Sequence, residues 1–128
     1  MYETRINECA GKAMISQPMG GVSEEEIVAT RDRAICYLRE HGYLFENTLF
    51  TDEWYAEEEA RIPGWITNRP LFFLARRLFF LARSLEAMSR CSTVYFCKGW
   101  ENARGCKIEH DAAVAYGLEI IYEEDSSV

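Results

Sequence analysis

The segment of residues 99–110, with the sequence Gly-Trp-Glu-Asn-Ala-Arg-Gly-Cys-Lys-Ile-Glu-His, places the tightest constraint on the fold. β-branched and aromatic residues at 92–97 precede it, as is typical of a strand, and a helical pattern at 111–117 follows it and ends at a glycine. The segment is therefore expected to join a strand to a helix through a loop. Backbone N–H groups that open a helix lie at the positive end of its dipole, so this junction favours an anionic ligand such as phosphate.

The side chains of this segment also suit a ligand site. Gly99 and Gly105 allow the backbone to turn tightly and to approach a ligand closely. Arg104 supplies a forked cation, and Glu109 lies one turn into the expected helix, where its carboxylate can face the loop. A structural alternative stays open, because glycines are common at strand–helix turns and Arg104 with Glu109 could form a surface ion pair of little energy.

The composition narrows the function classes. The 128 residues suffice for one domain with its own core, and we treat residues 1–128 as a single domain. The net charge of −7 and the pI near 4.9 argue against binding to a nucleic acid polymer, since no basic stripe is present to displace counterions. No apolar run reaches the roughly 18 residues of a membrane span, and residues 1–5 do not resemble a signal peptide, so we expect a cytoplasmic protein without membrane contact.

The cysteines point to a reducing compartment. Their number, five, is odd, and no two of them form a CxxC pair, which favours free thiols that mostly fill the core. A nucleophilic Cys106 is the minor alternative. We expect neither a metal ion nor a cofactor.

Strand and helix patterns alternate along the chain. Strands are expected at 12–16, 43–50, 92–97 and 118–122, and helices at 23–41, at 71–88 and after the loop at 99–105. This order predicts an α/β fold with a mostly parallel sheet between helices. Ligands of such sheets bind beyond the carboxyl ends of the strands, where the strand order switches. Residues 17–20 and 99–105 follow the first and third strands, so we expect them to line one crevice.

Two stretches stand apart from this alternation. Residues 51–70 form an acidic connection that carries Trp54 and Tyr55 and serves either as a binding loop or as a solvated insertion. The sequence Leu-Phe-Phe-Leu-Ala-Arg at 71–76 recurs at 78–83. We expect a helix over 71–88, with apolar residues to about 89. A repeat of seven residues lengthens this helix and keeps its apolar stripe on one face. Because this stripe exceeds what a small sheet needs, we expect part of it to contact another subunit, in a dimer or larger homo-oligomer. The alternatives are a core helix and, less favoured, a membrane-surface helix.

Several motifs together resemble a known family. They are Ile-Ser-Gln-Pro-Met-Gly-Gly at 15–21, the segment 99–105, Glu109 and Gly-Leu-Glu-Ile-Ile at 117–121. This combination resembles small phage and prophage proteins related to nucleoside 2-deoxyribosyltransferases and deoxynucleoside monophosphate N-glycosidases. The resemblance covers nearly the whole chain apart from the acidic connection and the repeated heptad. It implies a Rossmann-like three-layer sandwich with a small sheet of four to five strands, a dimer or larger assembly, and a pocket for a base, a sugar and sometimes a phosphate.

The same resemblance bears on catalysis. In the enzymes, a glutamate four residues after a loop glycine is the nucleophile at the anomeric carbon, and Gly105 and Glu109 have this spacing. The other family carboxylates are missing, since Ser84, Ser92 and Ala103 stand where the enzymes carry acidic residues. Loss of a general acid or base typically costs ~10²–10⁴-fold in rate, so the resemblance favours binding over catalysis.

The preferred function is therefore a non-enzymatic one. We expect a protein that binds and sequesters a nucleotide-type molecule, such as an NAD-derived or cyclic ADP-ribose-type immune signal, as a phage anti-defence protein in the host cytoplasm. Arg104 and the loop N–H groups would take phosphate, Gln17 and Asn102 would bind the base or ribose, and Trp100 would stack on the ligand or form a wall. The expected ligand-binding residues are Ser16, Gln17, Pro18, Met19, Gly20, Gly99, Trp100, Glu101, Asn102, Arg104, Gly105 and Glu109.

Two other functions stay open. In the first, the protein is an N-glycosidase or deoxyribosyltransferase with Glu109 as nucleophile, and Ser84 or a neighbouring subunit completes the site. In the second, it is a structural module whose working surface is the apolar helix. Individual residues have structural alternatives as well: Gln17 could cap a helix, and Trp100 could hold the loop against the sheet.

Overall fold

The computed structural model describes residues 11–46 and 69–124 of the chain and, within the helix that begins at Arg69, the side chains from Arg77 onward. Four strands form one sheet in the order β2-β1-β3-β4: β1 (Gly11–Ser16), β2 (Tyr43–Glu46), β3 (Thr93–Phe96) and β4 (Glu119–Tyr122). Every neighbouring pair is parallel. The predicted α/β class is thus confirmed, with four strands that are all parallel.

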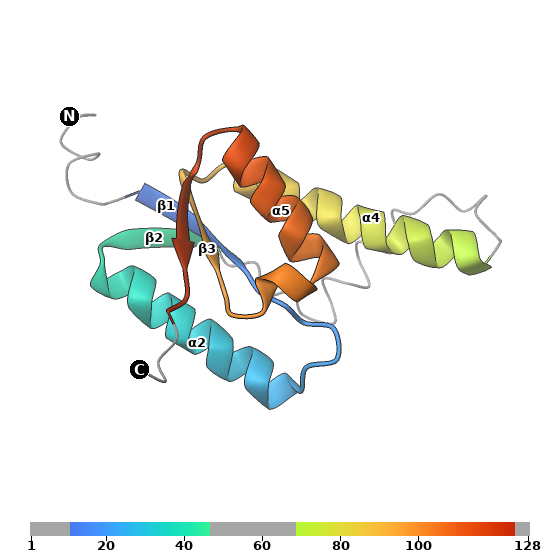
Figure 1. Ribbon diagram of the computed structural model, residues 1–128, viewed down its shortest axis with the longest axis horizontal. Coiled ribbons are helices and arrows are strands. Elements are labelled where there is room, and N and C mark those ends of the chain that lie inside the picture. The colour runs from blue at the N-terminus through green and yellow to red at the C-terminus, as the bar shows by residue number, and fades with distance from the viewer. Residues whose placement is uncertain (1–10, 47–68, 125–128) are drawn as a thin grey trace.

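In the described ranges, three helices cover this sheet from both sides, which makes the three-layer arrangement (Figure 1). Helix α2 (Glu24–Glu40) lies on one face, and helices α4 (Arg69–Met88) and α5 (Arg104–Ala115) lie on the other. The period-two alternation of the central strands explains why two cores form. One core contains Ala13, Ile15, Tyr95 and Cys97 with Ala34 and Leu38 of α2. The other contains Met14, Val94 and Phe96 with Ala87, Met88 and Ala113 of α4 and α5.

Helix α2 begins and ends as its sequence predicts. The Ser23 hydroxyl accepts a hydrogen bond from the Glu26 backbone N–H at 3.2 Å, and three glutamates occupy the first turn, where the helix dipole favours negative charge. The chain leaves the helix at His41, and Gly42 then takes a φ of +80°.

Helix α4 begins at Arg69, two residues before the expected start, and its first half extends past the sheet (Figure 1). Leu78 on this half is 57% exposed. The expected contact of this helix with another subunit stays a prediction. Of the helices in the described ranges, none is long and apolar enough to cross a bilayer. Residues 47–68, with most of the acidic connection, Trp54, Tyr55 and the end of the strand expected at 43–50, lie outside the described residues.

The strand order switches between β1 and β3. From β1 the chain passes through α2 to β2 on one side, and from β3 it passes through α5 to β4 on the other. The loops after Ser16 and Phe96 therefore leave adjacent strands in divergent directions, and the space between them is the expected position of a ligand site.

Candidate functional site

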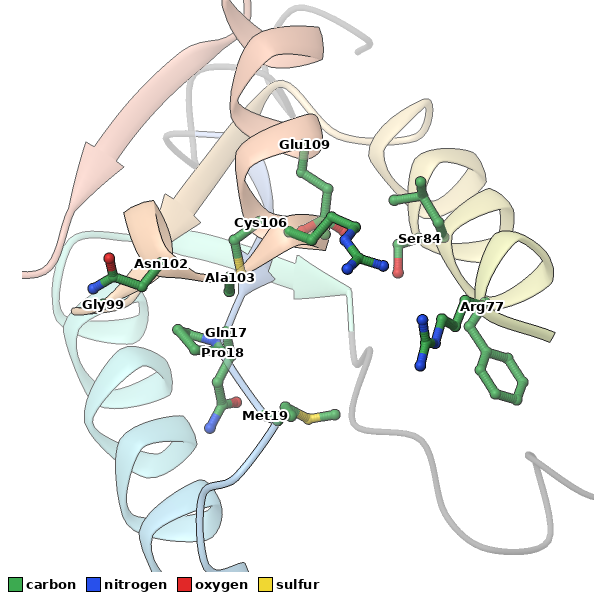
Figure 2. Close-up of a pocket in the computed structure, with 15 residues that line it drawn as sticks. Gln17, Pro18, Met19, Arg77, Ser84, Gly99, Asn102, Ala103, Cys106 and Glu109 are labelled. Carbon is green, nitrogen blue, oxygen red and sulfur yellow. The ribbon is translucent and has the colours of Figure 1, made fainter. Parts of the chain in front are cut away.

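A cleft of about 550 Å³ opens where β1 and β3 end, between α4 and α5 (Figure 2). This volume is within the usual range for small-molecule sites. Its wall combines the loop after β1, one side of α4 and the start of α5. The lining residues are Gln17, Pro18, Met19, Gly20, Arg77, Phe80, Leu81, Ser84, Gly99, Asn102, Ala103, Arg104, Gly105, Cys106 and Glu109. The two glycine-bearing segments, predicted to share a crevice, do so.

Gly99 brings the two loops together. Its φ of +86° lies in the left-handed region that favours glycine, and it precedes a short 3₁₀ helix, η1 (Trp100–Asn102). A Cβ at this position would lie 3.7 Å from the Pro18 side chain, so the loops after β1 and β3 are in near contact. The tight turn predicted at Gly99 is confirmed.

Gly105 has a different role from the one predicted. Helix α5 begins at Arg104, so Gly105 lies in its first turn and its φ is not positive. The prediction of a second tight turn is therefore wrong, because the segment expected to be loop as far as residue 105 becomes helix already at 104. A Cβ on Gly105 would meet no atom within 4 Å, so the helix has open space at this point.

The first turn of α5 is left without a side-chain cap. Ala103 is the N-cap residue and has no side-chain oxygen, and no acidic residue lies in the first turn. The Lys107 N–H already donates to the Ala103 carbonyl at 2.9 Å, so the N–H groups of 104–106 are the ones that precede the helical ladder. Both Ala103 and Gly105 line the cleft, so the positive end of the helix dipole faces it.

Glu109 is the carboxylate of the cleft, and it is only 7% exposed. The Ser16 hydroxyl donates to its Oε1 at 2.6 Å, and the Ser84 hydroxyl donates a second hydrogen bond. Burial raises the pKa of Glu109, while the two serine hydrogen bonds lower it by a smaller amount. The surface ion pair with Arg104, considered from the sequence, is wrong, because serine hydroxyls hold this carboxylate.

Ser16 and Ser84 act as positioning residues for Glu109. Ser16 is the last residue of β1, almost fully buried, and points to the face that α4 and α5 cover. Ser16 was expected to bind the ligand, but its hydroxyl binds Glu109 and it does not line the cleft. Ser84 comes from α4 and faces the cleft (Figure 2), so the position counted back from Gly99 does lie in the site.

Two arginines line the cleft from different helices. Arg104 opens α5, and Arg77 lies on α4 with its guanidinium turned into the cleft (Figure 2). Both are exposed, and neither forms an ion pair with another side chain in the described ranges. Sequence reasoning missed Arg77. The signal was present, since Arg77 precedes Ser84 by seven residues and therefore shares its side of the helix.

Gln17 lines the cleft, but its amide is bound to α2. The Nε2 group donates to the Ile27 carbonyl at 2.7 Å, and the Arg31 Nε donates to the Gln17 Oε1 at 3.1 Å. Figure 2 shows this side chain directed away from Glu109. Gln17 is thus bound to α2, but it does not cap this helix as the alternative had it, because the N-cap residue is Ser23. Its neighbours Pro18 and Met19, together with Phe80 and Leu81, give the cleft an apolar wall.

Trp100 and Glu101 are not brought to this cleft. The Trp100 ring stacks on His110 with centroids 4.1 Å apart and also contacts Phe96 and Tyr122. Together with Glu101 it lines a second hollow of about 470 Å³ beside β4. Trp100 thus holds the loop against the sheet. Asn102 remains at the Gly99 end of the cleft, away from Glu109 (Figure 2).

The Cys106 side chain lines the cleft and is buried. Burial raises the pKa of the Cys106 thiol to about 11, so this side chain is not the low-pKa thiolate that nucleophilic catalysis needs. Among the described residues, no group of three or more His, Cys, Asp and Glu side chains is placed to hold a metal ion.

Comparison with known protein families gave a match. A family model described as a domain of unknown function (DUF4406) matches residues 12–122, which include every residue of the cleft. The comparisons with curated proteins and with solved structures found no match.

Proposed function

The chain belongs to the DUF4406 family, and we propose that it binds and sequesters a nucleotide-type small molecule in this cleft. One observation carries the proposal: Arg104 and the uncapped start of α5 meet at a cleft of about 550 Å³ beyond the carboxyl ends of two parallel strands. A phosphate there would accept hydrogen bonds from backbone N–H groups and from a forked guanidinium at once. The open space beside Gly105 lets it approach the backbone closely.

The remaining walls suit the other parts of a nucleotide. Pro18, Met19 and Phe80 offer an apolar surface for a planar base. Glu109 and Ser84 lie across the cleft from the loop after β1, where they would face a sugar and accept or donate hydrogen bonds to its hydroxyls. The protein as a whole carries a net charge of −7, so the positive groups around this cleft give an anion a defined place to bind.

The residues that line the described cleft suit binding of a ligand without its turnover. Glu109 is the one carboxylate among the residues that line the described cleft, and its neighbours Ser16 and Ser84 are not acids that could protonate a departing base. In a phage, such a protein would act in the host cytoplasm by removing a nucleotide immune signal, for example an NAD-derived or cyclic ADP-ribose-type compound.

The test is retention of an intact compound. The purified protein is incubated with a panel of nucleosides, nucleotides, cyclic dinucleotides and ADP-ribose isomers, and the solution is then chromatographed before and after heat denaturation. We expect one phosphate-bearing compound to be depleted and to return unchanged on heating. Arg104→Ala should lose this retention, whereas Lys107→Ala, on an exposed position of α5 outside the cleft lining, should keep it. Failure to deplete any compound would refute the proposal.

A second candidate function rests on Glu109 itself. Its carboxylate is buried beside the cleft and oriented by two hydroxyls, which is the preparation that a nucleophile at an anomeric carbon needs. In that reaction Glu109 would form a glycosyl ester as the bond to the base breaks, and water would then hydrolyse the ester. The same chromatogram would show a free base, and Glu109→Gln would abolish its release.

A further inference from the structure

The long helix contributes a second cation to the cleft, on the wall opposite α5. Arg77 projects from α4 into the cleft (Figure 2), and Arg104, the first residue of α5, lines the same cleft from the other helix. Arg77 precedes Ser84 by two helical turns, so its Cα lies about 10 Å along the α4 axis from that of Ser84, whose hydroxyl binds Glu109. The two guanidiniums thus flank the cavity from two different helices.

Among the described residues that line the cavity, positive groups outnumber negative ones. Arg77, Arg104 and the N–H groups of the α5 start are positive or partly positive, and Glu109 supplies the one negative group among the described lining residues. Burial favours the neutral form of Glu109 by raising its pKa, which weakens even this compensation. Neither arginine is taken up by an ion pair with a described side chain. A single phosphate at α5 would therefore leave the Arg77 fork without an anion.

This imbalance specifies the ligand class more closely. Resting on the function proposed above, we propose that the ligand carries a pyrophosphate or two neighbouring phosphates, held between Arg104 with the α5 start on one wall and Arg77 on the other. Guanidinium forks match phosphate oxygens in a bidentate geometry, so two arginines on facing walls suit two linked phosphoryl groups. Arg77 is then a specificity-determining residue that separates nucleoside diphosphate-type ligands from nucleosides and monophosphates.

Inorganic anions test this without knowledge of the base. Calorimetric titration of the whole protein with pyrophosphate and with orthophosphate should give a pyrophosphate affinity at least about tenfold higher. Arg77→Gln should remove most of that advantage, and Arg77→Lys, which keeps the charge but loses the fork, should remove part of it. The matched control is Arg83→Gln, because Arg83 lies on the same helix but pairs with Glu86 at 3.0 Å and is not in the cleft lining. Unchanged pyrophosphate affinity in Arg77→Gln would overturn the inference.

A nucleotide series separates this inference from the proposed function. Adenosine, AMP and ADP are titrated into the wild type, Arg77→Gln and Arg104→Gln. We expect affinity to rise from adenosine to AMP through Arg104 and from AMP to ADP through Arg77. If AMP binds as tightly as ADP and Arg77→Gln changes neither, the pyrophosphate inference falls while nucleotide binding stands. If the panel of compounds described above shows no retention at all, the proposed function itself falls.

Discussion

The two ends of the parallel sheet each hold a glutamate that accepts hydrogen bonds from hydroxyl groups, and the cleft described above lies at the carboxyl end. At the carboxyl end, Glu109 is bound by Ser16 and Ser84. At the amino end, the Oε1 of Glu119 accepts from the Tyr43 hydroxyl at 2.6 Å and from the Thr93 hydroxyl at 2.8 Å. The hydrogen-bond chemistry is almost the same, so it does not by itself identify a ligand site.

The difference lies in the direction of the helices. In a parallel α/β fold, helices α2 and α5 start just after β1 and β3, whereas α2, α4 and α5 end just before β2, β3 and β4. The carboxyl end of the sheet therefore receives helix N-termini with free N–H groups, and the amino end receives helix C-termini with carbonyl groups. The hydrogen bond between Tyr43 of β2 and Glu119 of β4 therefore joins the two outer strands of the sheet. This hydrogen bond, more than burial, raises the pKa of Tyr43 to about 12.

Removal of a hydroxyl that binds one of the two glutamates should lower stability, and it should do so more strongly at Glu109 than at Glu119. Ser16→Ala removes a donor from a buried carboxylate and should lower the free energy of unfolding by about 1–3 kcal/mol. Tyr43→Phe removes a donor from an exposed carboxylate that water can solvate, and should cost less than about 1 kcal/mol. Urea denaturation of both variants measures the contrast, and equal losses would show that the two ends are not different in the way described.

The next prediction concerns how the loss of a charged side chain changes nucleotide affinity. Arg104→Ala should weaken binding of the retained nucleotide at least about tenfold, since it removes a charge-assisted hydrogen-bond donor from the α5 start. Glu119→Gln, at the opposite end, should leave the affinity within about twofold of the wild type. Calorimetry measures both, and a loss of affinity in Glu119→Gln would move the site away from the carboxyl end.

Gly105→Ala should change stability and binding in opposite directions. Because Gly105 is helical and a Cβ there meets no atom within 4 Å, alanine should stabilise the fold by about 0.5–1 kcal/mol. The same methyl group would occupy the space where a phosphate approaches the backbone, so nucleotide affinity should fall. A variant that is more stable and binds as well as the wild type would contradict the placement of the anion.

The control for this substitution is Gly99→Ala. At a φ of +86°, alanine is strained and should lower stability by about 1–2 kcal/mol. Thermal denaturation of both glycine variants compares the two positions directly.

The smallest expected effect is the pH dependence of stability that Glu109 causes, and the prediction concerns its direction. Because burial raises the pKa of Glu109 above its ordinary value of 4.5, the folded state binds a proton more readily than the unfolded state. The stability that this group contributes is fully present below pH 4.5 and is lost as the pH rises through the raised pKa. Glu109→Gln removes this loss, so its stability relative to the wild type should increase from about pH 4 to about pH 8. Thermal denaturation at both pH values checks this, and a relative stability that falls with pH would be the contrary result.

The parallel sheet and several residues of the cleft could be predicted from the sequence. Alternating strand and helix patterns predicted the parallel sheet, and the switch point predicted the meeting of residues 17–20 with Gly99 and Arg104. The position of Ser84 was also predicted correctly, although the repeated heptad leaves the register of that helix open over seven residues. Arg77, which lies between the two copies of the repeat, was not among the expected residues, although its spacing of seven residues from Ser84 places both on the same side of the helix.

The role of Trp100 was not predictable from its neighbours in sequence. An aromatic residue in a glycine-bearing loop suits ligand stacking and internal packing equally well. What decides between them is the position of Phe96, His110 and Tyr122, which come from three other elements and meet only in the folded chain. The hydrogen bonds of Gln17 to Ile27 and Arg31 of α2 likewise depend on how that helix is laid against β1.

We propose that an anion binds at the start of α5. The most direct measurement is a two-dimensional amide NMR titration of the isotopically labelled protein with the retained nucleotide and with the matching nucleoside. We predict that the Gly105 and Cys106 amide signals shift with the nucleotide and not with the nucleoside, because their N–H groups donate to phosphate. Shifts confined to the hollow around Trp100 and Tyr122, with no change at Gly105, would contradict the account.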